Sequence, residues 1–515
     1  MKYKIFIQWA VALMIGALAF GCIDDQGNYD YITAHQVLPV GISGLQESYS
    51  LQFGKTEHLA VTVEGDQNCK NLRYMWYMYK KPNWAERDTL GYGKTLDYYV
   101  DCESGNYQLW FEVRDTVKDV YVSQMAEVAV ETQLSNAWLV MKSENGMTDM
   151  DAVTADGSVM ENLVSQSLDK RLEGEAVKVA YVQQHSNEVK NPDGTTTVEN
   201  YKAFYILSEK EMLVFNAENM ELLKQSEDCF YEAPAKFDFM DCIANGRNMN
   251  LINAGKYHTL SGNSANVGKF SYSKAGPSNA AYQLHKENLF AGNYTMVWDC
   301  LTQSFLWAGS DSELAHFSAA DAGTPDFGSL TGMEVRLKHF LRAGKTYDWN
   351  IYNYIYAGYA IMTDDQGTDY LLSMAYAGKN KYPVKDYKAI PDGCQLGDAE
   401  VLCAHLTASS VYFAVHDAVW VHDINQSQVA NERERKLLPF KGEEITYLRH
   451  VSMANLNLDH LLVITFKDGN WKMYALPFIG GGSEINTGVD VEDYLIGKGK
   501  GRAAYCMRLF NNYEF

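Results

Sequence analysis

The sequence predicts an all-β protein in which an Ig-like β-sandwich is followed by a β-propeller of seven blades. Three observations predict this class. Strand-length apolar runs recur along the chain, and after residue 136 a hairpin with a tight turn returns about every 54 residues. No long segment shows the apolar i, i+3, i+4, i+7 period of a helix.

The first 21 residues have the layout of a secretory signal. Two lysines precede an apolar stretch of 16 residues from Ile5 to Phe20, and small residues then surround Cys22. A helix needs about 20 apolar residues to span a bilayer, so the alternative, a permanent membrane helix, fits less well. We therefore predict that residues 1–21 are a signal peptide.

Residues 22–35 are predicted to form a lipid anchor and tether, because they are polar and contain turn formers. The segment Ala19–Cys22 resembles a bacterial lipobox, although leucine is usual where Ala19 stands. This resemblance implies that the thiol of Cys22 is acylated. Asp24 and Asp25 resemble the acidic export signal of Bacteroidota lipoproteins; the alternative is a solvated acidic linker. The resemblance implies display on the outer face of the outer membrane.

Residues 36–133 are predicted to form the sandwich. Gly, Asn and Asp separate four strand-length runs, which are His58–Val63, Leu72–Tyr79, Tyr107–Val113 and Asp119–Val130. Trp76 lies in the middle of a dense aromatic run, so we expect it in the core. No cysteine pair flanks it with antibody-domain spacing, which favours an Ig-like domain without the inter-sheet disulfide.

Residues 136–515 are predicted to form the propeller. Asn-Gly and Asp-Gly favour type I′ hairpins because both central residues need a positive φ. A repeat of this length is typical of propeller blades. Counts of six or eight blades stay open, and the alternative architecture is two further β-sandwiches. The expected turns lie at Asn145-Gly146, Glu209-Lys210, Ala254-Gly255, Leu301-Thr302, Gln366-Gly367, His416-Asp417 and Asp468-Gly469. Segments 149–172 and 332–343 are also compatible with short helices.

Composition excludes some classes of partner. A net charge of −21 argues against nucleic acid, whose phosphates need a basic surface, and against docking on anionic lipid through the protein surface. The 35 tyrosines suit sugar- or peptide-binding surfaces, but half-exposed β-strands explain them more simply. Eight cysteines follow Cys22 without a CxxC pair, so a structural zinc site of that type is not expected. Their disulfide pairing is left open.

Sequence motifs give little support for catalysis. Neither HExxH nor GxSxG occurs, and we predict no cofactor and no metal. The acidic residues Asp149, Asp151 and Asp156 miss the twelve-residue calcium loop. The pairs His416-Asp417 and His422-Asp423 offer metal-binding groups, yet no third ligand is near in sequence. We therefore expect structural histidines there.

The segment from Thr363 to Tyr370 (TDDQGTDY) resembles in part the Asp-box of sialidase-like propellers, with Asp369 where threonine is usual. The expected role is a hairpin turn capped by Asp365, which would accept nearby backbone N–H groups. This turn is structural in those enzymes, so it supports a propeller and does not support sialidase activity.

The opening segment 22–31 (CIDDQGNYDY), the run Tyr74-Met-Trp76 and the segment Ala137–Val140 resemble the PKD-like family lipoproteins of Bacteroidota. The family's usual Asp or Gly-rich turn after the tryptophan is absent here. The resemblance implies an accessory component of a SusC/SusD-type importer, with importer subunits and neighbouring surface lipoproteins as partners. It also implies handling of an oligosaccharide or peptide nutrient.

These observations leave two candidate functions for the protein. The first is a non-enzymatic, lipid-anchored surface protein of the outer membrane that binds a ligand or importer proteins. The second is a surface hydrolase, of glycosidase or peptidase type, with its site in the propeller mouth. A glycosidase needs two carboxylates about 5 to 9 Å apart, and 65 acidic residues leave such a pair unassigned.

Overall fold

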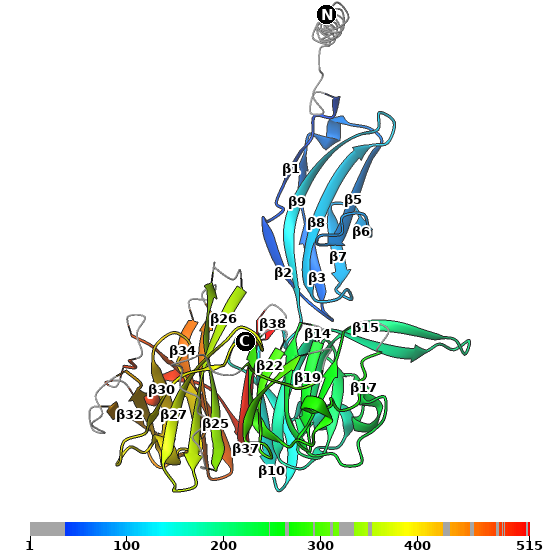
Figure 1. Cartoon of the computed structure of the whole chain (residues 1–515). Helices are drawn as coiled ribbons and strands as arrows, with labels where there is room; N and C mark the ends of the chain where they lie inside the picture. The colour runs from blue at the N-terminus through cyan, green and yellow to red at the C-terminus, as the bar shows by residue number, and fades with distance from the viewer. Residues whose placement is uncertain are drawn as a thin grey trace, which may run out of the picture. The chain divides into compact units, whose positions relative to one another are not determined.

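The structure, a computed structural model, describes most of the chain after residue 36 (Figure 1). The described ranges are 37–246, 248–262, 267–291, 294–309, 313–318, 334–348, 353–425, 433–453, 458–479, 484–486, 488, 490–510 and 513–514. The chain divides into two compact units, one of residues 1–101 with 106–129 and one of residues 102–105 with 130–515.

The first unit is a β-sandwich. Five strands form one sheet in the order β2-β9-β8-β5-β6, and two smaller antiparallel pairs, β1-β4 and β3-β7, accompany it. The strand bounds are β1 Gly41–Ser43, β2 Ser48–Gln52, β3 Thr56–Ala60, β4 Thr62–Glu64, β5 Leu72–Lys80, β6 Arg87–Tyr92, β7 Thr95–Tyr99, β8 Gly105–Asp115 and β9 Val120–Glu131.

Trp76 lies at the centre of this unit, as expected. Its side chain is fully buried, its ring centroid lies 4.7 Å from that of Phe111, and its Nε1–H donates to the carbonyl oxygen of Gly93 at 3.0 Å. The hydrogen bond satisfies the one polar atom that the ring brings into the core. Trp76 therefore combines a large apolar contact with a fixed orientation.

The second unit contains seven sheets. Six of them are built from consecutive strands, with the orders β14-β15-β16-β17, β18-β19-β20, β21-β22-β23-β24, β25-β26-β27-β28, β29-β30-β31-β32 and β33-β34-β35-β36. The seventh, which we call the closing sheet, has the order β12-β11-β10-β37-β38, with β13 paired to β11. It joins the beginning of the unit to its end, and Figure 1 shows β37 beside β10.

The strand bounds of the closing sheet are β10 Trp138–Glu144, β11 Met147–Val153, β12 Val159–Met160, β13 Leu172–Glu173, β37 Arg502–Phe510 and β38 Tyr513–Glu514. The next three sheets comprise β14 Ala176–Lys190, β15 Thr196–Ser208, β16 Met212–Asn216, β17 Leu222–Lys224, β18 Phe239–Asn245, β19 Asn248–Asn253, β20 Lys256–Leu260, β21 Leu284–Ala291, β22 Tyr294–Asp299, β23 Ser304–Gly309 and β24 Ala315–His316.

The last three sheets comprise β25 Val335–Asp348, β26 Asn353–Asp364, β27 Asp369–Tyr376, β28 Val384–Ala389, β29 Leu402–Ala404, β30 Ser410–Val415, β31 Ala418–Asp423, β32 Glu434–Pro439, β33 Glu444–Met453, β34 Leu458–Lys467, β35 Asn470–Pro477 and β36 Leu495–Lys500.

The seven sheets form a closed ring. The strands β37, β14, β18, β21, β25, β29 and β33, which we call the inner strands, each contact the next in this order, and β33 contacts β37. Seven separate apolar clusters fill the spaces between neighbouring sheets. A strand that packs against neighbouring sheets on both faces carries apolar side chains at consecutive positions. This is seen in Leu461–Ile464, where four consecutive side chains are buried. The predicted all-β class and seven-bladed propeller are confirmed.

The seven hairpins expected from the sequence occupy equivalent places. Each joins the second and third strands of its sheet, counting β37 as the first strand of the closing sheet. At the first hairpin Asn145 and Gly146 have φ values of 55° and 72°, and at the last Asp468 and Gly469 have 51° and 80°. These positive values are what a type I′ turn requires.

The expected helices are largely wrong. Segment 332–343 lies mostly in strand β25, because Val335-Arg336-Leu337-Lys338 alternates between a buried and a more exposed side chain. Segment 149–172 contains one short helix, α3 (Leu163–Leu168), beside strands β11 and β12. In the described part of the chain, no helix combines the length and apolar character needed to cross a membrane.

A buried ion pair lies in the closing sheet. Lys142 Nζ on β10 lies 2.7 Å from Asp151 Oδ1 on β11, and the two side chains are 5% and 0% exposed. Asp151 also accepts hydrogen bonds from the backbone N–H of Asn162 at 2.8 Å and from Trp471 Nε1 at 3.0 Å. Because Trp471 belongs to β35, this single carboxylate connects the closing sheet to the sheet before it.

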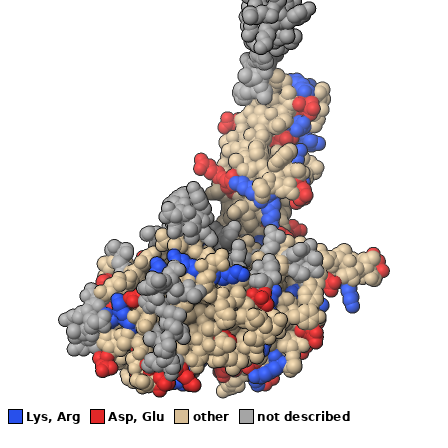
Figure 2. Space-filling model, viewed as in Figure 1, with Lys and Arg blue, Asp and Glu red and all other residues tan. Residues whose placement is uncertain are grey.

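Charged side chains are interspersed on the face of the molecule in Figure 2, where Lys and Arg alternate with Asp and Glu among larger uncharged areas. The described residues of this face carry no continuous basic surface.

Candidate functional site

The residues assigned to sorting, Cys22, Asp24 and Asp25, lie outside the described residues. Lipidation at Cys22 and the export role of the two aspartates therefore stay predictions. The described chain offers three other groups of polar side chains. One group lies on the inner strands, and two are compact clusters of potential metal ligands.

On the inner strands, polar contacts link neighbouring sheets. Lys178 on β14 lies 2.8 Å from Asp241 Oδ1 on β18, and 5.5 Å above the ring of Tyr505 on β37. Asn288 on β21 donates its side-chain N–H to the other oxygen of Asp241. Burial opposes the charge of Lys178, but Asp241 outweighs it and raises the pKa of the lysine. Four successive inner strands are thus joined by paired groups.

Glu287 on β21 continues these polar contacts to the next inner strand, β25. It accepts a hydrogen bond from His339 Nδ1 on β25 at 3.1 Å and from the backbone N–H of Phe340 at 2.7 Å. Burial would raise the pKa of Glu287, yet these donors hold it below its ordinary value. A general acid needs a raised pKa at neutral pH, so Glu287 is poorly suited to protonate a leaving group.

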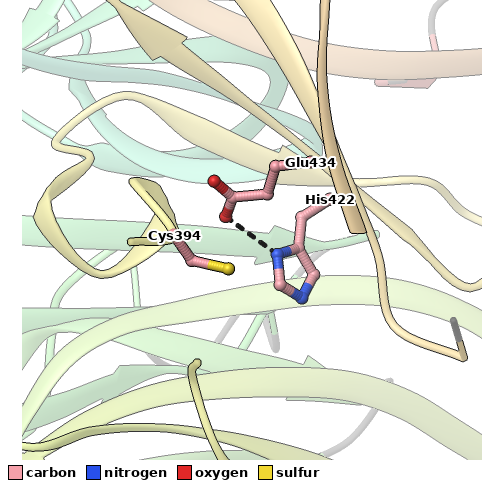
Figure 3. A group of neighbouring side chains, drawn as sticks. All are labelled: Cys394, His422 and Glu434. Atoms are coloured by element: carbon pink, nitrogen blue, oxygen red, sulfur yellow. Dashed lines mark hydrogen bonds and ion pairs between the residues drawn. The ribbon is translucent and has the colours of Figure 1, made fainter. Parts of the chain in front are cut away.

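The first compact cluster consists of Cys394, His422 and Glu434 (Figure 3). His422 on β31 and Glu434 on β32 are paired in register across the two strands. Cys394 comes from the connection between β28 and β29, just before a 3₁₀ turn at 396–398. In Figure 3 the three side chains converge from these three segments. One potential ligand atom of each lies within 4.8 Å of the others.

Glu434 holds this cluster together. Its oxygens accept His422 Nδ1–H at 2.9 Å and the backbone N–H groups of Gln395 and Leu396 at 2.7 and 3.2 Å. The His422 side chain is completely buried and that of Glu434 is 4% exposed. The second ring nitrogen of His422, Nε2, is buried without a hydrogen-bond partner. An unsatisfied buried nitrogen of this kind calls for an explanation.

The chemistry of Cys394 argues against a nucleophile. Burial and the neighbouring carboxylate of Glu434 raise the pKa of Cys394 to about 11. A catalytic cysteine needs a thiolate, formed by an adjacent histidine or another cation. Here the thiol faces a carboxylate, which keeps it protonated. The cluster therefore has the donors of a cation site rather than the arrangement of a cysteine hydrolase.

The second compact cluster consists of His405, His450 and Asp459. His450 Nδ1 accepts the backbone N–H of Leu406 at 2.8 Å, and its Nε2 donates to Asp459 at 2.7 Å. His405 Nδ1 likewise accepts backbone N–H groups, that of Ala408 at 2.8 Å. Each neutral ring therefore carries its proton on Nε2. A metal at Nε2 would require an imidazolate or the loss of these backbone bonds, so this cluster serves to hold the turn after β29.

Sequence reasoning placed His422 among structural histidines because no third ligand was near it in sequence. The structure supplies both neighbours from a distance: Glu434 through strand register and Cys394 through a loop from the other side. A local signal is the charged run from Arg433 to Lys436, in which Arg433 and Glu434 are buried. His416 lies in a hairpin turn with φ 54°.

The acidic residues weighed as a calcium loop have separate structural roles. Asp149 accepts hydrogen bonds from Val164 N–H at 3.0 Å and Ser165 Oγ at 2.6 Å at the start of α3. Asp156 caps its own turn through the backbone N–H of Ser158 at 3.0 Å. Asp151 belongs to the ion pair of the closing sheet. They do not converge on a common point.

The Asp-box-like turn is present, but its capping residue was predicted one position too late. Asp364 rather than Asp365 accepts the backbone N–H groups of Gln366 and Thr368, at 2.9 and 2.8 Å, and the hydroxyl of Tyr370 at 3.1 Å. The eight cysteines after Cys22, all within the described residues, form no disulfide.

Comparison with known proteins gives one family match. Residues 22–179 match the model of the PKD-like family. No curated protein matches the chain. Three solved structures are similar to it at low identity. A Quinonprotein alcohol dehydrogenase-like protein from Bacteroides thetaiotaomicron VPI-5482 is 11% identical with a TM-score of 0.38, over 91% of this chain and 97% of that one.

The second is BBS1N in complex with ARL6DN, at 10% identity and a TM-score of 0.27, over 73% of this chain and 90% of that one. The third is the extracellular domain of a hybrid two component system from B. thetaiotaomicron, at 9% identity and a TM-score of 0.21, over 66% and 50%. The family match covers the sandwich, the strands β10–β13 of the closing sheet and the start of β14. Residues 22–179 of this chain are therefore similar to the PKD-like family, and the remaining residues, 180–515, lie outside that match.

Proposed function

We propose that this chain is a lipid-anchored protein on the outer face of the outer membrane, which binds a nutrient ligand or importer subunits without chemistry of its own. One observation carries the proposal. The PKD-like match begins at Cys22, the residue that the signal-peptide layout makes the first of the mature chain. The start of the family match at Cys22 therefore supports the boundary proposed from the signal-peptide layout.

The outer face of the five-stranded sheet supports a binding role. Tyr77, which is 7% exposed, and the partly buried Trp110 stack across β5 and β8 beneath this face, with ring centroids 6.2 Å apart and ring planes 1° from parallel. On β9, Tyr121 is 50% exposed, and the Arg114 guanidinium lies 4.7 Å from its ring centroid. Aromatic faces flanked by arginine suit the stacking of sugar rings and peptide groups.

The pairing of the polar groups in the propeller supports a role without catalysis. Lys178 with Asp241 and Glu287 with His339 satisfy one another between neighbouring inner strands. Groups engaged in this way stabilise the ring, whereas a hydrolase in the propeller mouth would need a carboxyl group free to exchange protons with a substrate.

Gentle purification of the outer-membrane complex through a tag on this chain tests the proposal. We expect SusC/SusD-type importer subunits to co-purify from mild detergent, and added protease to digest the chain on intact cells. The matched control is Cys22→Ser, which removes the acylated thiol and should release the chain from the membrane fraction. Recovery of the wild-type chain alone, or its protection from protease in intact cells, would contradict the proposal.

The aromatic face is tested by a screen of oligosaccharides and peptides against the wild-type protein and Tyr121→Ala. The substitution should weaken binding of any ligand found at least several-fold, because it removes a half-exposed ring of this face. Tyr272→Ala, which removes a 65% exposed ring from the propeller unit, is the control. Equal loss in both variants would place the ligand elsewhere.

A further inference from the structure

We propose that Cys394, His422 and Glu434 bind a single divalent cation of the zinc class. The inference does not depend on the membrane role proposed above, so either can fail alone. Three side chains supply a sulfur, an imidazole nitrogen and a carboxylate oxygen within 4.8 Å of one another. Zinc is commonly bound by this combination of donor types, whereas calcium and magnesium prefer oxygen ligands throughout.

The three groups are already held in position. Strand pairing places His422 opposite Glu434, and the backbone N–H groups of Gln395 and Leu396 fix the carboxylate. Because these two amides directly follow Cys394, the same bonds also fix the cysteine beside the carboxylate. Ligands whose positions are set by surrounding hydrogen bonds lose little freedom when a metal binds.

Two protons occupy the place that a cation would take. His422 Nδ1–H donates to Glu434, and the Cys394 thiol carries its own proton within 4.8 Å of both. When the metal M²⁺ binds, the S–H bond breaks, the S–M bond forms and the thiol proton leaves to solvent. The imidazole proton moves from Nδ1 to Nε2, which frees the Nδ1 lone pair for the metal. No electron is transferred, and one proton is released for each cation bound.

Charge and exposure fit this cation. A thiolate and a carboxylate together carry two negative charges, which a divalent ion balances within a buried site. Cys394 is partly exposed whereas His422 and Glu434 are buried, so solvent reaches the site from the cysteine side. A water molecule there would complete the four ligands that zinc prefers.

The second cluster provides an internal contrast. His405 and His450 also lie close to a carboxylate, but the Nδ1 atom of each ring accepts backbone N–H groups. Their protons cannot shift to Nδ1 without breaking those bonds, so Nε2 is not available to a metal. In the first cluster no backbone donor occupies His422 Nδ1, whose bond is to Glu434 itself.

Titration of the purified full-length protein with Co²⁺ tests the site, because a thiolate–cobalt bond gives a near-ultraviolet charge-transfer band. We expect one equivalent of Co²⁺ to produce this band, and Zn²⁺ to displace it. Cys394→Ser should abolish the band while keeping a hydroxyl donor for Glu434, so its thermal unfolding without metal should match that of the wild type. Cys300→Ser, at an exposed cysteine, and His450→Asn should keep the band.

The outcomes are decisive in both directions. Absence of the band in the wild-type protein, or its persistence in Cys394→Ser, would overturn the proposal. A rise in unfolding temperature on adding Zn²⁺ that persists in Cys394→Ser and is lost in His450→Asn would assign the metal to the other cluster and would also overturn it. Added Zn²⁺ should further raise the unfolding temperature of the wild type and leave that of Cys394→Ser unchanged, which gives a second readout independent of spectroscopy.

Discussion

The sandwich and the propeller are held together in different ways. The sandwich is centred on the packing of Trp76 and Phe111, and it carries exposed ion pairs such as His58 with Asp97, where both side chains are 76% exposed. The propeller depends on the pairing of its two chain ends and on a fully buried ion pair in the closing sheet. This difference shows that a ring of sheets built from consecutive strands needs one sheet that pairs strands from the two ends of the unit. Loss of that pairing affects every sheet of the ring.

Removal of residues 502–515 should have the largest effect. Without β37, strand β10 keeps only β11 as a partner, and the ring of inner strands is interrupted between β33 and β14. We expect the propeller to lose its protease-resistant core while the sandwich persists as a fragment in limited proteolysis. Removal of residues 511–515 alone, which leaves β37 intact, is the control. A truncated chain whose protease-resistant core is as large as that of the wild type would contradict this role of the β10–β37 pairing.

Asp151→Ala should lower the free energy of unfolding by about 3–5 kcal/mol, because it leaves the buried Lys142 without a counter-charge. Denaturant unfolding measures the effect. The double variant Asp151→Leu with Lys142→Met removes both charges and should recover much of the loss. Asp97→Ala in the sandwich, at an exposed pair, should leave stability unchanged. Equal losses at Asp151 and Asp97 would contradict the comparison.

Acid should destabilise the propeller before the sandwich. Burial lowers the pKa of His185 on β14 to about 3, against an ordinary value of 6.5. Below pH 6.5 the His185 ring therefore becomes protonated in the unfolded chain but stays neutral in the folded chain. The free energy of unfolding falls as the pH drops towards 3. Between pH 6.5 and 5 this one group should cost about 2 kcal/mol.

The measurement for this prediction is unfolding followed at several pH values, with His185→Gln as the control. Removing the titrating ring should flatten the pH dependence of the propeller transition, even if the variant is less stable throughout. A variant whose stability falls as steeply as that of the wild type would assign the acid effect to other groups, such as His258, His285 and His450, whose pKa values burial also lowers.

The smallest effect is expected where the two units are alike. Gly54 in the sandwich and Gly469 in the propeller both have positive φ, 76° and 80°, with no atom within 4 Å of an added Cβ. Alanine at either position should cost about 1 kcal/mol through backbone strain alone. Thermal unfolding of the two variants tests this. A much larger cost at Gly469 would mean that this hairpin contributes to ring closure.

Local features were predictable because their causes lie within a few residues. The Asn145-Gly146 and Asp468-Gly469 turns follow from residues that tolerate positive φ, and all seven expected hairpins are present. Segment 332–343 was wrong because its apolar spacing suits a helix or a strand over so short a length, and pairing with β26 decides for the strand. The capping of the Asp-box-like turn by Asp364 depends on which carboxylate reaches the backbone, which spacing alone does not decide.

By itself, the sequence determined the class of the protein, the order of its two units, the repeat of the second and the sorting signals expected around Cys22. Only the tertiary structure decided that β37 pairs with β10, and that Cys394, His422 and Glu434 converge. The physical reason is the distance along the chain over which each kind of interaction acts. Turn conformation and strand propensity act between neighbours, whereas ring closure and the meeting of ligands depend on register between segments that have no contact until the chain is folded.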